Sequence, residues 1–189
     1  MSNNYYQTKE SVEEYISLAN NSNGSQLIEK LKSYLPAHSK LLEIGSGPGT
    51  DFQLLKKDYQ VIGSDYSVEF LRRLRRSNSG DEFLNLDAVT LKTDEKFDGI
   101  YSNKVLQHLT DLELKESIAR QVELLHFNGI ICHSFWKGEG EERFKVLLVN
   151  YQTEETLRML FEGHFEVLLL ETYLEFEEGD SILFIGRRK

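Results

Sequence analysis

Residues 41–51 read LLEIGSGPGTD and contain the side chains whose types and spacing suggest chemistry. The segment has three glycines at alternate positions, Gly45, Gly47 and Gly49. Glycines allow unusual backbone angles and let a ligand approach the main chain closely. Acidic residues stand on both sides of this loop, Glu43 before it and Asp51 after it. A glycine turn that opens a helix usually binds an anion, which these carboxylates would repel, so the segment favours a ligand with a positive charge.

A dinucleotide-binding loop is the main alternative for this segment. Its G-x-G-x-x-G pattern requires Gly or Ala at the sixth position, where this chain has Thr50. Asp51 in the first helical turn would oppose a pyrophosphate. Glu43 lies within a buried strand, where a lone carboxylate costs several kcal/mol unless a cation or hydrogen bonds satisfy it. The ammonium group of S-adenosylmethionine (SAM) would satisfy both acids, whereas NAD would leave them unexplained.

The elements that must position this loop follow from hydrophobic periodicity. Apolar runs of strand length alternate with helical patterns, which predicts parallel strands joined by helices in a doubly wound α/β sheet. We expect strands at residues 40–44, 60–64, 81–86, 97–102 and 130–134, and helices at residues 50–58, 67–76 and 110–126. Thr110 and Glu113 form a capping-box pattern, and Asn128-Gly129 is expected to end that helix.

The two ends of the chain depart from this rhythm. Residues 8–36 predict two helices joined near residues 20–24, and residues 133–144 are expected to form a loop in which Gly138 and Gly140 permit movement. After a helix at residues 153–162, two strand-like runs at 165–175 and 181–187 are separated by a short polar connection. A connection of that length predicts a hairpin, so one late strand should be antiparallel to its neighbours.

Four further segments carry candidate residues in order along the chain. VIGSDYS, residues 61–67, ends the second strand with Asp65, and LNLDAVTL, residues 84–91, contains Asp87-Ala88. FDGIYSNKVLQHL, residues 97–109, covers the fourth strand and the loop after it, and LLHFNGIICHSFW, residues 124–136, covers the fifth strand and its approach. Together with LLEIGSGPGTD, these segments resemble the motifs of class I SAM-dependent methyltransferases, although Asn128 stands where that family usually has proline.

The resemblance of these motifs implies a Rossmann-like sheet of seven mostly parallel strands, in the order 3-2-1-4-5-7-6 with strand 7 antiparallel. It implies SAM as the cofactor and S-adenosylhomocysteine (SAH) as its product. In the family, the acid that matches Asp65 binds the ribose hydroxyls, and the pair that matches Asp87-Ala88 meets adenine. Carried onto this sequence, the cofactor-binding residues are Glu43, Gly45, Ser46, Gly47, Gly49, Asp65, Tyr66, Asp87, Ala88 and Asn103.

Structural roles are the alternatives for several of these residues. The glycines could form a tight turn only, Asp65 could cap a helix that Ser67 also suits, and Asp87 could be a turn residue. The tyrosines of the N-terminal segment, Tyr5, Tyr6 and Tyr15, stand where the family often folds a helix over the cofactor. Simple packing on the domain explains them equally well.

Catalysis of methyl transfer requires mainly the correct positioning of the acceptor, so few residues are diagnostic. His108 in LQHL is the candidate general base, placed by resemblance at the floor of the acceptor pocket, and a histidine satisfied by backbone groups is the equal alternative. His133 is a weaker candidate, and Lys104 could pair with an anionic acceptor or be solvated. The five histidines show no metal-ligand spacing, so no metal is expected.

Composition restricts the remaining function classes. The chain of 189 residues fits one domain, which we divide into an N-terminal helical cap (1–38) and a Rossmann-like core (39–189). Its net charge of −9 disfavours nucleic acid as a partner, and no segment resembles a secretory signal or a membrane span. The single cysteine, Cys132, fits a reducing, cytoplasmic location. We expect a methyltransferase for a small-molecule acceptor, with a non-catalytic SAM-binding protein or an NAD-dependent oxidoreductase as the alternatives and the oligomeric state left open.

Overall fold

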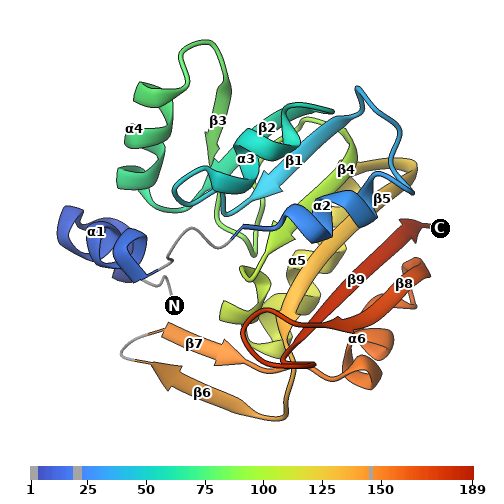
Figure 1. Cartoon of the computed structure of the whole chain (residues 1–189). Helices are drawn as coiled ribbons and strands as arrows, with labels where there is room; N and C mark the ends of the chain where they lie inside the picture. The colour runs from blue at the N-terminus through green and yellow to red at the C-terminus, as the bar shows by residue number, and fades with distance from the viewer. Residues whose placement is uncertain (1–3, 19–22, 145–146) are drawn as a thin grey trace.

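The computed structural model describes residues 4–18, 23–144 and 147–189 of the chain (Figure 1). Its strands are β1 (Lys40–Ile44), β2 (Gln60–Asp65), β3 (Glu82–Asn85), β4 (Phe97–Asn103), β5 (Leu125–Trp136), β6 (Glu141–Phe144), β7 (Leu147–Asn150), β8 (Phe165–Tyr173) and β9 (Ser181–Arg188). Its α-helices are α1 (Lys9–Leu18), α2 (Ser25–Leu31), α3 (Thr50–Leu55), α4 (Val68–Ser77), α5 (Asp111–Leu124) and α6 (Glu154–Phe161). Two short 3-10 helices, η1 (Asn4–Gln7) and η2 (Leu106–His108), complete the described elements.

The main sheet has seven strands in the order β3-β2-β1-β4-β5-β9-β8. Strands β1 to β5 pair with one another in parallel, whereas β9 lies antiparallel between β5 and β8. Because β6 and β7 form a separate hairpin, β8 and β9 are the sixth and seventh strands of this sheet. The predicted fold class, strand order and antiparallel last strand are therefore confirmed.

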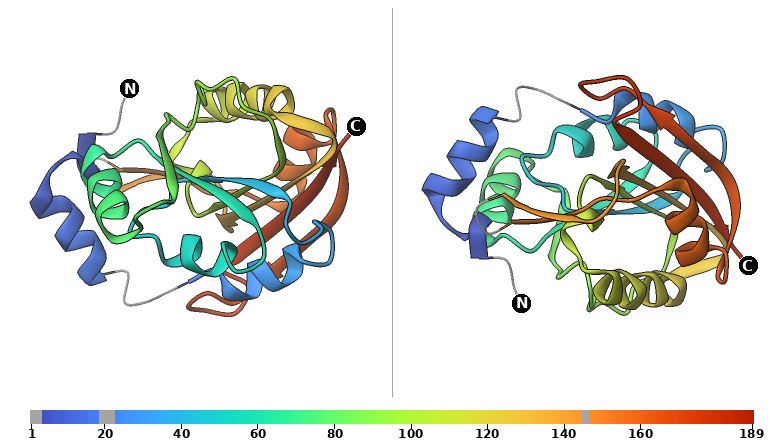
Figure 2. Two further views of the ribbon diagram at one scale, coloured as in Figure 1. Left: turned by 90° about the horizontal axis from the view of Figure 1, so that it is seen from above. Right: turned by 90° about the horizontal axis from the view of Figure 1, so that it is seen from below.

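Helices cover both faces of this sheet (Figure 2). One face packs on α5 and α6 through a core that includes Leu114, Ile118 and Phe161. The other face packs on α2 and α3, and α4 joins α3 over the β3 end of the sheet through Phe52, Leu71, Leu74 and Phe83. The carboxyl ends of β1 and β4 point toward the side of the molecule where α1 and the β6–β7 hairpin lie (Figure 1).

Local signals explain where several helices begin. Thr110 and Glu113 form the predicted capping box at the start of α5, and the Ser67 hydroxyl caps α4 by accepting a hydrogen bond from the Phe70 amide at 3.1 Å. Both caps satisfy backbone amides that have no partner within the helix. The two predicted N-terminal helices are also present, but most of their predicted junction, residues 19–22, lies outside the described part of the chain.

Two predictions about the region after α5 are wrong. The helix ends at Leu124 rather than at Asn128-Gly129, and Asn128 lies inside β5 with a φ of 65°. The cause is a register shift in the pairing of β4 with β5, which accommodates extra residues between Leu125 and Ile130. Residues 133–144 are not a loop, because β5 continues to Trp136 and β6 begins at Glu141.

Candidate functional site

The glycine loop adopts a conformation that only glycine tolerates well. Gly45, Gly47 and Gly49 have φ values of 73°, 50° and 88°. A β-carbon at Gly45 would lie 2.5 Å from a Val105 methyl group, and one at Gly49 would lie 2.6 Å from Leu74. A β-carbon at Gly47 would meet no described atom within 4 Å. Two of the glycines are thus required by packing, whereas Gly47 faces open space that a ligand could enter.

Glu43 lies beneath this loop and is only 2% exposed. Its carboxylate accepts a hydrogen bond from the Ser46 hydroxyl at 2.5 Å, and the same hydroxyl oxygen accepts one from the Ser64 amide at 3.1 Å. Burial, together with the smaller effects of the Asp51 and Asp65 carboxylates, raises the pKa of Glu43 to about 8 against the opposing effect of the Ser46 hydrogen bond. A carboxyl group that is so poorly solvated fits a cationic ligand, because a nearby positive charge would stabilise its ionised form.

Asp65 ends β2 and connects it to the glycine loop. One carboxylate oxygen accepts a hydrogen bond from the Gly47 amide at 2.8 Å, and the other accepts one from the Ser67 amide at 2.7 Å. Each oxygen can still accept a further hydrogen bond, so a diol remains a possible partner. Burial raises the pKa of Asp65 despite these amide hydrogen bonds. The helix-capping role belongs to Ser67, and Asp65 instead holds the loop in place.

Among the described residues, none offers a cationic partner to the three acids of this region, Glu43, Asp51 and Asp65. No ion pair between described residues involves Glu43, Asp51 or Asp65. Asp51 instead accepts hydrogen bonds from the Gly24 amide at 2.6 Å, the Tyr101 hydroxyl at 2.8 Å and the Asn103 side-chain amide at 3.0 Å. The site is therefore electrostatically suited to a ligand with positive charge.

The remaining predicted binding residues lie along the same edge of the sheet. Asn103 ends β4, and its side-chain oxygen accepts a hydrogen bond from the Ser134 hydroxyl at 2.6 Å. Asp87 shapes the turn after β3, where one of its oxygens accepts hydrogen bonds from the Val89 and Thr90 amides at 2.9 and 3.1 Å. The Ala88 carbonyl accepts a hydrogen bond from α5, and the Tyr66 side chain is exposed. Asp87 is thus a turn residue, which was the structural alternative to adenine binding. Its second carboxylate oxygen is left for another partner.

His108 lies at the end of η2, beneath the β6–β7 hairpin. Its Nδ1 lies 2.6 Å from the carbonyl oxygen of Leu148 in β7. A carbonyl only accepts, so Nδ1 carries the proton and Nε2 holds a lone pair when the ring is neutral. Burial lowers the pKa of His108 below its ordinary value, which favours that neutral form. This histidine therefore has a backbone partner on one nitrogen and a basic nitrogen on the other.

Two other residues that the sequence suggested for catalysis, His133 and Lys104, make hydrogen bonds within the fold. His133 is fully buried between the Ser102 hydroxyl and the Gln121 side chain, each 2.8 Å away, and burial lowers its pKa to about 3. Lys104 adopts a φ of 57° and donates hydrogen bonds to the Phe135 carbonyl at 2.8 Å and the Ser181 hydroxyl at 2.6 Å. Its ammonium also lies 3.7 Å from the centroid of the Trp136 ring. Of the two alternatives for Lys104, the solvated one is wrong, because this side chain ties the end of β4 to β5 and β9.

Sequence reasoning missed the partners of these side chains. Gly24, Tyr101 and Leu148 contribute a backbone amide, a hydroxyl and a backbone carbonyl from distant segments. A backbone amide or carbonyl cannot be recognised from the type of residue that carries it. Only Tyr101, in the segment FDGIYSNKVLQHL, has a side chain that could have been proposed as a partner. Among the described residues, no group of three or more His, Cys, Asp or Glu side chains could hold a metal ion.

The N-terminal tyrosines pack on the helix that follows Asp65. Tyr6, Tyr15 and Phe70 form a cluster with ring centroids 5.3 to 6.0 Å apart, and the Ser67 hydroxyl donates a hydrogen bond to the Tyr6 carbonyl. Partial burial and the carboxylates of Asp65 and Asp51 raise the pKa of Tyr15. The side chain of Tyr5 lies outside the described part of the chain. α1 therefore lies next to the acids of the glycine loop.

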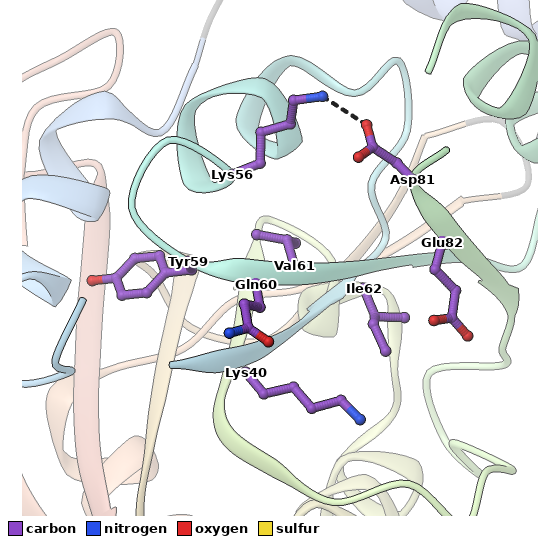
Figure 3. A pocket seen from close by; sticks show the side chains of 8 residues that line it. All are labelled: Lys40, Lys56, Tyr59, Gln60, Val61, Ile62, Asp81 and Glu82. Carbon is purple, nitrogen blue, oxygen red and sulfur yellow. Dashed lines mark hydrogen bonds and ion pairs between the residues drawn. The ribbon is translucent and has the colours of Figure 1, made fainter. Parts of the chain in front are cut away.

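A separate surface cavity of about 380 Å³ lies at the opposite edge of the sheet (Figure 3). It is lined by the first residues of three strands, Lys40, Gln60 and Glu82, and by the ion pair between Lys56 and Asp81 at 2.6 Å. In parallel sheets ligands bind at the carboxyl ends of the strands, and this cavity lies at the amino ends. The glycine loop, rather than this cavity, is the candidate site.

Comparisons with known proteins bear on the fold that positions this site. A family model described as a methyltransferase domain matches residues 41–129. The 1,6-didemethyltoxoflavin-N1-methyltransferase of Burkholderia thailandensis superposes with a TM-score of 0.78 at 19% identity, covering 95% of this chain and 84% of that chain. The N-methyltransferase NodS of Bradyrhizobium japonicum, in complex with SAH, gives 0.73 at 18% identity and covers 98% and 99%. A SAM-dependent methyltransferase of Clostridium acetobutylicum gives 0.74 at 14% identity and covers 95% and 98%.

The similar structures share the fold, and the matching family model spans the glycine loop, Asp65, Asp87 and His108. No helix among the described residues is long and apolar enough to cross a membrane. A positively charged cofactor accounts for the buried carboxyl group of Glu43, which a dinucleotide does not. The chain therefore resembles the class I SAM-dependent methyltransferases, in its fold and in the family model that matches residues 41–129.

Proposed function

We propose that this methyltransferase acts on a small-molecule acceptor and that His108 accepts the proton that the acceptor loses. The observation that carries the catalytic part of the proposal is the hydrogen bond from His108 Nδ1 to the Leu148 carbonyl, at 2.6 Å. It leaves Nε2 basic at neutral pH, and general bases work best in that form. The bond also holds the ring in one orientation, as the positioning of an acceptor requires.

The residues around the glycine loop fit the cofactor. We place its ammonium by Glu43 and the loop Gly45–Ser46–Gly47–Gly49, its ribose hydroxyls on Asp65, and its adenine by Tyr66 and the second oxygen of Asp87, next to Ala88. Asn103 would border its methionine end. When bound, SAM supplies a methyl group that is activated by a sulfonium. The chain itself orients the acceptor, excludes water and accepts a proton at Nε2 of His108.

The domain division and the location form part of the same proposal. Residues 1–38 would act as a cap on the core formed by residues 39–189, which the contacts of Tyr6 and Gly24 with the core support. The buried thiol of Cys132, the single cysteine, is consistent with a cytoplasmic protein. A nitrogen nucleophile is the first acceptor class to test, because two of the similar structures are named as N-methyltransferases.

A fractionated cell extract tests the acceptor class. We expect the purified protein to release SAH from SAM when it is given the fraction of small metabolites, and not when it is given the protein or nucleic acid fraction. Radiolabelled SAM would show the label moving into a compound of low molecular mass. Label that moves only into a macromolecule would contradict the proposal, and a heat-treated sample of the enzyme is the control.

The ribose assignment of Asp65 predicts a large loss of cofactor affinity. The Asp65→Ala variant should bind SAH about 2–4 kcal/mol more weakly, because ribose hydroxyls and the Gly47 amide lose their acceptor. Isothermal titration calorimetry measures this change. Asp81→Asn, which removes a carboxylate at the far edge of the sheet, should bind SAH like the wild type. An unchanged affinity in a folded Asp65→Ala protein would refute the assignment.

A further inference from the structure

Asp51 explains how the N-terminal segment is attached to the core. Gly24 precedes α2, and its amide donates to one Asp51 oxygen at 2.6 Å. The second oxygen of the same carboxylate accepts from the Tyr101 hydroxyl at 2.8 Å and from the Asn103 side chain at 3.0 Å. Hydrogen bonds to an ionised group are roughly twice as strong as neutral ones. This carboxylate thus joins α3, β4 and the start of α2.

Gly24 fits against this group without space for a side chain. A β-carbon at this position would lie 2.1 Å from the Tyr101 hydroxyl, 2.6 Å from an Asp51 oxygen and 3.1 Å from the Asn103 side-chain nitrogen. The Tyr101 side chain is 1% exposed and cannot easily move aside. The close approach requires glycine, so both sides of the contact are specialised for it.

The described N-terminal residues are attached to the core at a second place. Beside the Ser67–Tyr6 contact, the Gln7 side chain donates a hydrogen bond to the Tyr66 carbonyl at 3.2 Å, and Arg73 pairs with Glu13 at 3.2 Å. These contacts lie next to Asp65, at the ribose end of the proposed cofactor site. The contact between Gly24 and Asp51 lies next to Asn103, at the methionine end. The N-terminal segment is therefore fixed at both ends of the site.

We propose that Asp51 is a positioning residue that holds the N-terminal segment over the cofactor site through the Gly24 amide, and that it is not a ligand of the cofactor ammonium. The inference rests on the cofactor placement proposed above. It answers why an acid follows the glycine loop, because Asp51 already accepts three hydrogen bonds from the protein. Glu43 then remains the acid that meets the positive charge.

Two variants disturb the contact from opposite sides. Asp51→Asn places an amide donor in the group that must accept from Gly24, Tyr101 and Asn103. Gly24→Ala introduces the clash with Tyr101 while it leaves the Asp51 carboxylate intact. We measure the affinities for SAH and for 5′-methylthioadenosine, which lacks the amino acid part of the cofactor. Asp81→Asn is the matched control, because its carboxylate pairs with Lys56 far from this contact.

The proposal predicts that both variants bind both ligands more weakly, each by about tenfold, because covering the site affects the adenosine and methionine parts alike. It would be overturned if Asp51→Asn weakened SAH alone and Gly24→Ala had no effect, since Asp51 would then bind the ammonium directly. It would equally be overturned if neither variant changed the affinity for either ligand.

Hydrogen exchange of the cofactor-free protein separates positioning from a general loss of stability. We expect faster exchange in both variants, confined to peptides from residues 9–18 and 23–31, with the rest of the chain unchanged. Faster exchange throughout the chain would show a merely structural role for Asp51. A wild-type protein that binds neither ligand would contradict the cofactor placement instead, and the exchange experiment would still test the contact.

Discussion

The His108→Asn variant should lose about 10²–10⁴-fold in kcat/KM and keep the wild-type affinity for SAH. Asparagine carries its amide nitrogen close to the position of Nδ1, so the hydrogen bond to the Leu148 carbonyl can persist. What the variant lacks is Nε2, the atom that we propose as the base. The rate of SAH release with the active metabolite fraction, together with calorimetric SAH binding, measures both quantities.

The pH profile gives an independent test of the same role. Burial lowers the pKa of His108, so the neutral base should persist to a lower pH than an ordinary histidine would allow. The wild-type rate should fall only when the pH drops below that lowered pKa, and this acidic limb should disappear in His108→Asn. A variant that keeps a rate within threefold of the wild type would exclude His108 as the base. His133→Asn is not a suitable control, because that ring is buried in a structural network.

The Glu43→Gln variant should be more stable than the wild type in the absence of cofactor. The pKa of Glu43 is raised to about 8, so the native state binds more protons than the unfolded chain between about pH 4.5 and 8. Wild-type stability therefore falls as the pH rises through that window. Glutamine does not titrate, and its advantage should grow from near zero at pH 4.5 to about 3–5 kcal/mol above pH 8. Chemical unfolding at several pH values measures it.

The same substitution should weaken SAM binding, so stability and affinity change in opposite directions. A cationic ligand favours the ionised form of Glu43, and binding to the wild type should release on the order of one proton between pH 6 and 7.5. Calorimetry in buffers with different ionisation enthalpies detects that proton. The groups that also face Glu43 are Ser46, Asp51 and Asp65, so the variant should abolish most of the release. Equal release in both proteins would assign the proton to Asp65 instead.

The sequence contained enough local information to predict the fold but not its accessory hairpin. The strands and helices follow from alternating apolar runs and helical patterns, whereas the strand order came from the resemblance to class I methyltransferases. The starts of α4 and α5 follow from Ser67 and Thr110. β6 reads Glu-Glu-Arg-Phe, which has no apolar alternation, and glycines precede it at positions 138 and 140. Its partner β7 reads Leu-Leu-Val-Asn, a short apolar run whose pattern alone does not distinguish a strand from a buried helix segment. A hairpin of this kind is defined by its contacts with the rest of the protein.

The candidate site also has features that the sequence predicts and features that it does not. Glycine spacing and buried acids predict a cationic ligand from residue types alone. Closely spaced glycines indicate a backbone that a ligand can approach, and a buried carboxylate costs free energy unless a cation or hydrogen bonds satisfy it. The role of Asp51 could not be predicted, since its principal partner is the backbone of Gly24, 27 residues earlier in the chain. The surroundings of Lys104 were hidden for the same reason, because they combine a carbonyl of β5 with a hydroxyl of β9.

The place of Trp136 has a practical consequence. It is the single tryptophan of the chain and it ends β5. Its indole ring contacts the Lys104 side-chain nitrogen and stacks on the ring of Phe176, whose centroid is 5.7 Å away. A neighbouring positive charge shifts indole emission, so the tryptophan component of the protein's fluorescence reports on this corner of the molecule. Unlabelled compounds can therefore be screened optically, and a compound that displaces Phe176 would reveal itself by a change in emission.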